Sequence, residues 1–251
     1  ALELAQAGLR VIVVEARRVG WGASGRNGGQ VIFGFGCEQP KIAAMVGPEL
    51  SRRMFDWSLE GVRLVRERIA AHGIDAGWRD GHAHVAIKPR HVTELKAWQA
   101  DLAENYDYPL QWWDREPLQA VVSSPRYIGA LYDPCSGHLH PLNYTRGLAR
   151  AATQAGVRIF EQSRVTSLQR GARPLLRTDG GEVQADFVVL AGNALVHEQR
   201  WDGELAYMKC LLDYLGMDNV TNARLNGTPA ANRLARHSAP TICSTVRGAG
   251  N

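Results

Sequence analysis

The sequence predicts a mixed protein of the α/β class, α+β overall, in which a partial Rossmann-like domain carries an inserted antiparallel-sheet domain. The first observation is a helical segment, Ala1 to Gly8, that leads into the apolar run 11–14 and ends at Glu15. The second is another apolar run, 187–191, which we expect to be a buried strand that ends at Gly192. The third is the stretch between them, where helical and strand spacing alternate without a repeated βαβ unit. Together they favour a nucleotide-binding fold interrupted by an insertion with its own sheet.

The segment before Glu15 matches the second half of a βαβ nucleotide-binding unit. Gly8 supplies the positive φ that commonly ends a helix, and run 11–14 has the composition of a strand buried on both faces. An acid at the end of such a strand accepts hydrogen bonds from nucleotide ribose hydroxyls. The strand and G-x-G-x-x-G turn that open such a unit are not found, so we expect a chain truncated at its N-terminus. The alternative for Glu15 is a solvated acid at a strand end.

A glycine-rich loop follows, Gly20 to Gln30, with five glycines. So many glycines let the backbone pass close to a flat or anionic ligand, with amide groups left to donate hydrogen bonds. Ser24 and Asn27 add polar side chains, and Arg26 adds a permanent positive charge. The alternative is a flexible surface loop.

The string VIVVEARRVGWGASGRNGGQ closely resembles the FAD-binding region of the D-amino-acid-oxidase-like superfamily, and within it the gamma-glutamylputrescine oxidoreductases. The resemblance implies FAD as the cofactor, with the acid on its ribose and the loop along the flavin and phosphates. The residues it implies for FAD binding are Glu15, Ala16, Ser24, Gly25, Arg26, Asn27, Gly28, Gly29 and Gln30, with Val165, Ala191 and Gly192 further along the chain.

The same resemblance implies a division into domains. Residues 1–37 and 141–195 form a discontinuous FAD-binding domain that lacks its first strand and glycine turn. Residues 38–140 form the substrate or cap region. After 196 the resemblance fades, and no apolar period is evident beyond residue 220. We therefore expect 196–251 to be an atypical tail that is divergent, frame-shifted or poorly folded.

Apolar spacing predicts the elements of the middle of the chain. The expected helices are 49–72, 93–105, 142–155 and a short one at 205–215. The expected strands are an edge strand at 81–87, then 127–132 and 157–160, and a small meander of 165–168, 175–178 and a strand around Val183. The aromatic-rich stretch 108–117 is expected to be irregular.

Cys135, His138 and His140 have a spacing that zinc would accept, with His82 and His84 as further donors. The alternative is a strand-to-helix turn in which the histidines serve as hydrogen-bonding groups. We favour the turn and expect no metal, because no second spaced pair completes a set of four ligands. The resemblance agrees, since family members carry a similar Gly-His-x-His-Pro turn without metal.

Composition narrows the class of protein. The net charge of +4 is mild and the arginines are interspersed with acids, which disfavours a nucleic-acid partner. No apolar stretch is long enough to cross a bilayer, so we expect no transmembrane segment. The four cysteines are far apart, which favours a reduced protein in the cytoplasm. The sequence does not specify an oligomeric state.

The function that the resemblance implies is oxidation of the C–N bond of an amine or amino acid, with hydride transfer to flavin. A gamma-glutamylputrescine-like amine is the implied small-molecule partner. No catalytic residue is identified, although Tyr132, His138, His140 and Tyr144 are candidates by their proximity to the domain junction. Two alternatives stay open: a non-catalytic truncated remnant of the same family, and a histidine/cysteine metal-binding module.

Overall fold

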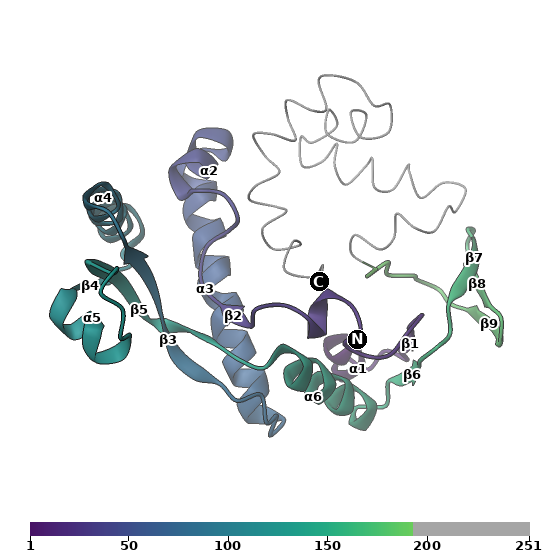
Figure 1. Cartoon of the computed structure of the whole chain (residues 1–251). Coiled ribbons are helices and arrows are strands. Elements are labelled where there is room, and N and C mark those ends of the chain that lie inside the picture. The colour runs from purple at the N-terminus through teal and green to yellow at the C-terminus, as the bar shows by residue number, and fades with distance from the viewer. Residues whose placement is uncertain (193–251) are drawn as a thin grey trace, which may run out of the picture. The chain divides into compact units, whose positions relative to one another are not determined.

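The computed structural model describes residues 1–192 (Figure 1). The chain divides into two compact units: unit 1 contains Ala1–Ala23 and Ala149–Asn251, and unit 2 contains Ser24–Leu148. The domain boundaries expected at residues 37 and 140 differ from these borders and stay a prediction. The expected helix 205–215 and the expected tail 196–251 lie outside the described residues.

Unit 1 contains a parallel pair of strands, β1 (Ile12–Val14) and β6 (Arg158–Phe160). Both lie where apolar runs predicted strands. The expectation that the first run is buried on both faces is wrong, because each residue of β1 is only half-buried. Within the described part of unit 1, β1 and β6 pair only with each other, so no further strand covers their outer edges.

Each strand of this pair follows a helix that ends in the same way. α1 (Leu2–Gln6) precedes β1, and α6 (Pro141–Gln154) precedes β6. Gly8 and Gly156, at φ +84° and +91°, turn the chain out of the two helices. The amide after each glycine donates to the carbonyl five residues earlier, at 3.0 Å in both cases. These bonds satisfy carbonyls that a helix end leaves unpaired, and they confirm the predicted helix–glycine–strand order.

The predicted meander is confirmed as an antiparallel sheet of three strands in unit 1. Its strands are β7 (Val165–Gln169), β8 (Leu175–Thr178) and β9 (Gly181–Gln184), paired in that order. The Thr178 hydroxyl accepts a hydrogen bond from Gly180 N at 3.2 Å and donates to Gly181 O at 3.0 Å. The turn between β8 and β9 is therefore closed by a side chain at its first position.

Unit 2 is built on one long central strand, β5 (Gly129–His138). It pairs antiparallel with β3 (Arg79–Ala86), β4 (Gln111–Asp114) and β2 (Gln30–Val31). The sequence predicted only its first half, as a strand over 127–132. The turn expected from Cys135 onward is wrong in its position, because pairing with β2 and β3 extends the strand to His138.

The helices of unit 2 are α2 (Gln39–Val46), α3 (Pro48–Ala71), α4 (Pro89–Tyr106) and α5 (Arg115–Val121). Helices α3 and α4 match the predictions, whereas α2 was not anticipated. The irregular structure expected at 108–117 is wrong, because β4 forms there by pairing with β5 and α5 follows directly. No helix among residues 1–192 combines the length and the apolar character needed to span a membrane.

One face of the unit 2 sheet packs against α3 and α4. Phe33 lies at the centre of the contact, with ring centroids 5.6 Å from Phe55 and 4.8 Å from Tyr108. The buried members of this cluster, called the aromatic core, are Phe33, Phe55, Leu102, Tyr106, Leu110 and Leu131. A buried polar junction joins three helices beside it, where Ser51 Oγ contacts Gln39 Nε2 at 2.9 Å and the Tyr106 hydroxyl at 3.0 Å.

A second cluster lies along the other half of α3. Its buried members are Ile74, Ala76 and Leu139, and Val65 and Ile69 of α3 pack against them. The glycine Gly61 lies between the part of α3 that meets the aromatic core and the part that meets this second cluster. A Cβ at Gly61 would meet no atom within 4 Å, so no close approach requires glycine there.

A bulge in β5 is organised by the buried carboxylate of Asp133, which is 1% exposed. The ladder pairs His82 with Asp133 and then Asp80 with Gly137, so three residues of β5 oppose the single residue Gly81. Within this bulge the Asp133 carboxylate accepts hydrogen bonds from the amides of residues 135 and 136, at 2.9 and 3.1 Å. It also accepts one from the Tyr108 hydroxyl at 2.8 Å. The bulge is therefore held by a side chain where the ladder is interrupted.

We expect Asp133→Asn to lower the free energy of unfolding by about 1–3 kcal/mol, measured by chemical denaturation. An amide offers one acceptor oxygen, so at least one of the three donors loses its buried partner. The control is Asp114→Asn, because exposed Asp114 accepts one hydrogen bond from Trp112 Nε1 at 2.9 Å that an amide oxygen can also accept. The control is expected to change stability by no more than about 0.5 kcal/mol. Equal effects of the two substitutions would contradict this role of Asp133.

Candidate functional site

Three predicted cofactor residues of unit 1 lie near the carboxyl ends of β1 and β6. Glu15 follows β1 directly; its amide donates to Phe160 O at 2.8 Å and its carbonyl accepts from Ser163 N at 2.9 Å. Val165 opens β7 two residues after Ser163, and Ala16 is exposed beside Glu15. Ligands of parallel α/β sheets bind at this end of the strands. The structure thus brings Glu15, Ala16 and Val165 together.

The side chain of Glu15 is half-buried, and one carboxylate oxygen accepts a hydrogen bond from Arg17 N at 2.7 Å. This bond fixes the direction of the carboxylate at the strand end. An ionised carboxylate has about four acceptor positions, so the group can still accept hydroxyl donors such as those of a ribose.

Glu161 is a second acid at this end of the sheet, and it was not predicted from the sequence. It follows β6 as Glu15 follows β1, and its carboxylate accepts a hydrogen bond from Val19 N at 2.7 Å. Gln162 N donates to Arg17 O at 2.7 Å. These bonds fasten the segment after Glu15 to the segment after β6. The signal in the sequence was the expected strand 157–160, which is also followed directly by a glutamate.

The remaining loop residues, Ser24 to Gln30, belong to unit 2. Ser24 O accepts hydrogen bonds from Thr145 Oγ1 at 2.9 Å and from Asn27 Nδ2 at 3.3 Å. The side-chain oxygen of Asn27 accepts one from Gly29 N at 2.8 Å. Gln30 begins β2 and pairs with His138. The amide of Asn27 therefore shapes the loop, and Thr145, which the sequence analysis did not select, fastens it to α6.

Gly29 is the position at which this loop requires glycine. It is buried, has φ +75°, and its carbonyl accepts a hydrogen bond from Leu139 N at 2.9 Å. A Cβ there would lie 2.1 Å from Leu139 O, a backbone atom that cannot rotate away. At Gly28 the atoms met would be those of the Gln30 side chain, which can move. Because Gly29 has no side chain, the loop packs directly against the backbone of residues 139–141.

The loop so held presents its backbone and polar groups on the surface of unit 2. Gly25 is half-buried, and the exposed members are Ser24, Arg26, Asn27, Gly28 and Gln30. Ala23–Gly25 form one 3-10 turn, and Gln30 begins β2. A constrained, glycine-rich backbone with an exposed guanidinium fits an anionic, phosphate-bearing ligand. The residues present therefore fit the diphosphate of a dinucleotide.

The third group of predicted residues, Ala191 and Gly192, is not placed as expected. The strand predicted over 187–192 is wrong: the segment pairs with no described strand, and Phe187 and Val189 are 89% and 76% exposed. A parallel strand is stabilised by ladders on its edges, which are missing here. Ala191 and Gly192 are exposed.

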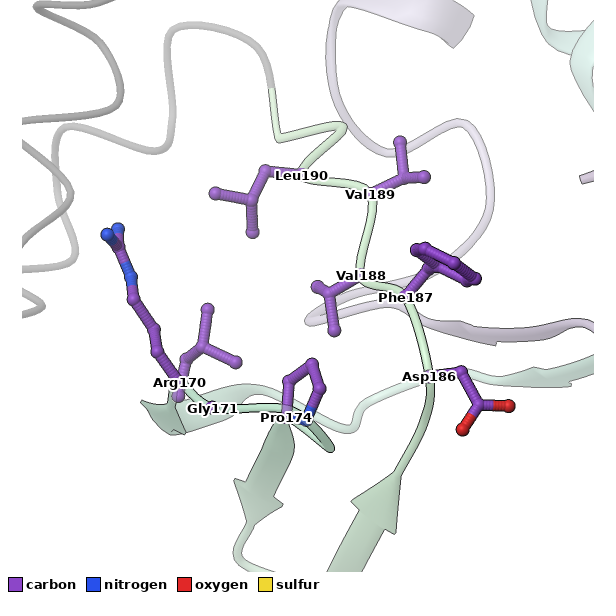
Figure 2. Close-up of a pocket in the computed structure, with 9 residues that line it drawn as sticks. Arg170, Gly171, Pro174, Asp186, Phe187, Val188, Val189 and Leu190 are labelled. Carbon is purple, nitrogen blue, oxygen red and sulfur yellow. The ribbon is translucent and has the colours of Figure 1, made fainter.

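A pocket of about 410 Å³ lies between this segment and the β7–β8 turn (Figure 2). The stretch Asp186–Leu190 runs along one side of it, and Arg170, Gly171 and Pro174 border the other. Its lining is mainly apolar. None of the predicted cofactor residues lines it.

Among the described residues, no group of three or more His, Cys, Asp or Glu side chains is placed to hold a metal ion. Cys135 is an exposed free thiol. His138 lies in β5, whereas His140 Nδ1 accepts a hydrogen bond from Asn143 N at 3.3 Å in the first turn of α6. Of these side chains, that of His140 serves as a hydrogen-bonding group at the start of the helix.

A histidine pair lies on the helix-facing side of the unit 2 sheet. The rings of His82 and His84 meet edge to face at 4.6 Å, and His84 meets Trp98 in the same manner at 4.9 Å. Burial lowers the pKa of His84 to about 4, helped by His82 and opposed by Asp133. Burial also lowers the pKa of His82. The same surroundings raise the pKa of Tyr108, through burial and its hydrogen bond to Asp133.

Comparison with known proteins matches residues 1–207 to the DAO family, described as FAD dependent oxidoreductase. Gamma-glutamylputrescine oxidoreductase of Escherichia coli K12 is 34% identical over 246 residues, covering 97% of this chain and 56% of that protein. The "Probable oxidoreductase OrdL" of Haemophilus influenzae is 39% identical over 198 residues, covering 78% of this chain and 46% of that protein. The chain spans about half the length of these curated relatives. The family match to residue 207 and the match to the Escherichia coli enzyme over 97% of this chain both extend into the segment 196–251, where the resemblance was expected to fade.

Among solved structures, L-amino acid deaminase from Proteus myxofaciens in complex with anthranilate is similar, with a TM-score of 0.63 and 25% identity. The match covers 77% of this chain and 42% of the deaminase. The mixed α/β fold class predicted from the sequence is confirmed.

We expect Gly29→Ala to lower the free energy of unfolding by about 2–4 kcal/mol, because strain at positive φ is added to a clash with a backbone carbonyl. The control is Gly34→Ala. Gly34 has φ +84°, but a Cβ there meets no atom within 4 Å. The control should cost only about 1 kcal/mol, the strain alone. Thermal or chemical unfolding of both variants checks the difference, and equal losses would show that the contact with Leu139 O is unimportant.

We expect the stability of the protein to fall as the pH is lowered from about 6.5 to 4 because of His84. In this window the unfolded chain binds a proton at His84 that the folded chain does not, so acid favours unfolding. His84→Phe keeps an aromatic ring against Trp98 and removes the titrating group. Urea unfolding at several pH values should show a smaller acid loss in this variant, whereas His72→Gln, at the half-buried residue that follows α3, should retain it. An unchanged loss in His84→Phe would contradict the assignment.

Proposed function

This chain belongs to the DAO family of FAD-dependent oxidoreductases, and from that membership we propose that it oxidises the carbon–nitrogen single bond of an amine or amino acid. The observation that carries the proposal is the loop Ser24–Gln30, which Asn27, Thr145 and the close approach of Gly29 to Leu139 hold in one shape. A loop fixed in this way binds a cofactor without first losing conformational freedom.

We assign the FAD-contacting roles by unit. In unit 1, Glu15 would accept hydrogen bonds from the ribose hydroxyls, with Ala16 and Val165 as neighbouring contacts. In unit 2, Ser24 to Gln30 would lie along the phosphates and the flavin, with Arg26 as the positive charge. Ala191 and Gly192 are kept as expected contacts to phosphate or ribose. Their exposed, unpaired segment gives this last assignment the least support.

The proposed chemistry needs no nucleophile or metal from the protein. FAD, when bound, supplies the two-electron acceptor for a hydride that leaves the amine-bearing carbon. The remaining imine is hydrolysed by water. The contribution of the residues described above is to bind and orient the cofactor, and no side chain among them is assigned as an acid or base.

For the substrate we propose a gamma-glutamylputrescine-like amine. The support is the 34% identity to the Escherichia coli enzyme of that name over nearly the whole of this chain. We also propose a cytoplasmic location, supported by the free thiols of Cys37 and Cys135.

A second candidate is a member of the family that no longer binds flavin or turns over substrate. One observation favours it: the segment carrying Ala191 and Gly192 is exposed, although a cofactor contact was expected there. The two candidates are separated by purifying the chain, recording the visible absorbance of bound flavin, and adding gamma-glutamylputrescine in the absence of oxygen. Bleaching of bound flavin supports the oxidoreductase. A chain that stays colourless even after incubation with FAD supports the second candidate.

We expect Glu15→Gln to weaken FAD binding by about 10- to 100-fold, because hydrogen bonds to a charged acceptor contribute about 1.5–3 kcal/mol. Equilibrium titration with FAD measures the change. Glu182→Gln is the matched control, since Glu182 is an exposed acid of the same unit that pairs with Arg177 at 2.8 Å. It should bind FAD as the unchanged chain does. Equal affinities for all three proteins would exclude Glu15 from the site.

A further inference from the structure

The unit 2 sheet has two different faces. Trp112, Leu131 and Asp133 lie on the face that meets the aromatic core and Tyr108. Side chains alternate along a strand, so Trp113 of β4 and Tyr132 of β5 lie on the opposite face. The register places Gln111 opposite Tyr132 and Trp113 opposite Ala130, which makes Trp113 and Tyr132 diagonal neighbours.

Trp113 and Tyr132 form a stacked pair, called here the aromatic stack. Their ring centroids are 4.0 Å apart and the rings are inclined by 18°. Both side chains are half-buried. A Cβ at Gly81, on the neighbouring strand, would lie 2.4 Å from the Tyr132 hydroxyl and 2.7 Å from a ring carbon. The glycine therefore lets Tyr132 lie close against β3, and the outer face of Trp113 is the surface that the pair can offer to a ligand.

The aromatic stack, like Trp98, has no cation over its rings among residues 1–192, which distinguishes it from four other tryptophans. Four tryptophans have an arginine or lysine over the ring at 4.9–5.5 Å: Trp21 with Arg17, Trp57 with Arg53, Trp78 with Arg66, and Trp112 with Lys96. Within residues 1–192, no such cation lies over Trp113 or Tyr132. The negative ring faces of the stack are thus left for a positive charge from outside the described chain.

We propose that the aromatic stack binds the primary ammonium group of the amine substrate and so positions it; the bound group releases one proton to water before the hydride leaves the amine-bearing carbon. This inference rests on the proposed function, which supplies a substrate with such a group. An ammonium over a tryptophan face gains about 0.5–2 kcal/mol, depending on how far the site is desolvated. Because both residues are half-buried, we expect a gain in binding free energy between these two limits. Trp113 is the main positioning residue, and Tyr132 holds its ring in place.

The test is a calorimetric titration of the whole chain with two probes. The first is N-acetylputrescine, which carries one primary ammonium. The second is its alcohol analogue, in which a hydroxyl replaces the ammonium. For Trp113→Leu we expect the affinity for the ammonium probe to fall about 3- to 30-fold, with the affinity for the alcohol changed by less than about 2-fold. Trp113→Phe, which keeps a ring, should restore most of the difference.

Trp57→Leu is the matched control, because Trp57 is an exposed tryptophan of the same unit with Arg53 over its ring. It should leave both affinities unchanged. Equal weakening of the two probes by Trp113→Leu would show a purely structural role and overturn the inference. So would unchanged affinities, or a native chain that does not bind the ammonium probe.

Flavin absorbance, recorded on the same samples, separates this inference from the proposed function. If the chain binds flavin and Trp113→Leu binds the ammonium probe as tightly as the native chain, the proposed function stands and the role of the aromatic stack is contradicted. If the chain binds no flavin but Trp113→Leu still weakens binding of the ammonium probe, the aromatic stack stands as a cation site and the proposed function is contradicted.

Discussion

The carboxylate of Asp133 accepts three hydrogen bonds inside the unit 2 sheet, and the geometry of β5 on either side depends on them. Before Asp133 the strand pairs with β4 and carries Tyr132 into the aromatic stack. After it, the strand pairs with β2 and so holds Gln30 at the end of the glycine-rich loop. The buried carboxylate of Asp133 thus fixes the geometry of both the aromatic stack and the end of the glycine-rich loop, for which different ligands are proposed. Such a charge is tolerated in the interior because donors surround it.

The loop obeys a second constraint, which is a matter of space. Gly29 approaches a backbone carbonyl more closely than any side chain permits, and the Asn27 side chain closes the turn before it. In unit 1 the corresponding constraint is supplied by acids, because Glu15 and Glu161 each bind an amide of the segment that follows β1. The loop of unit 2 and the strand ends of unit 1 are therefore fixed by different means.

Much of this was predictable from the sequence, and the exceptions have physical causes. Helices with strong apolar periods and glycine endings, such as α3 and α6, were predicted within a residue or two, because their signals are local. The second half of β5 and all of β4 were not, since pairing with distant strands decides their conformation. The strand expected at 187–192 is wrong for the same reason. Its composition suits a buried strand, but the segment pairs with no described strand. In the candidate site, Glu15 and Gly29 were selected by pattern and stay predictions as cofactor contacts, whereas Thr145 and Glu161 act through contacts that spacing does not reveal.

Gly61 separates two halves of helix α3 that have different packing partners. Its first half packs into the aromatic core through Phe55, its second half packs against Ile74 and Ala76, and Gly61 lies between the two with open space around it. Glycine inside a helix costs about 1 kcal/mol relative to alanine, so the helix is weakest where its two packing partners change. Local opening of α3 would therefore cost least near Gly61, between the two clusters that protect its halves. The longest helix of unit 2 has its lowest helix propensity where its packing partner changes.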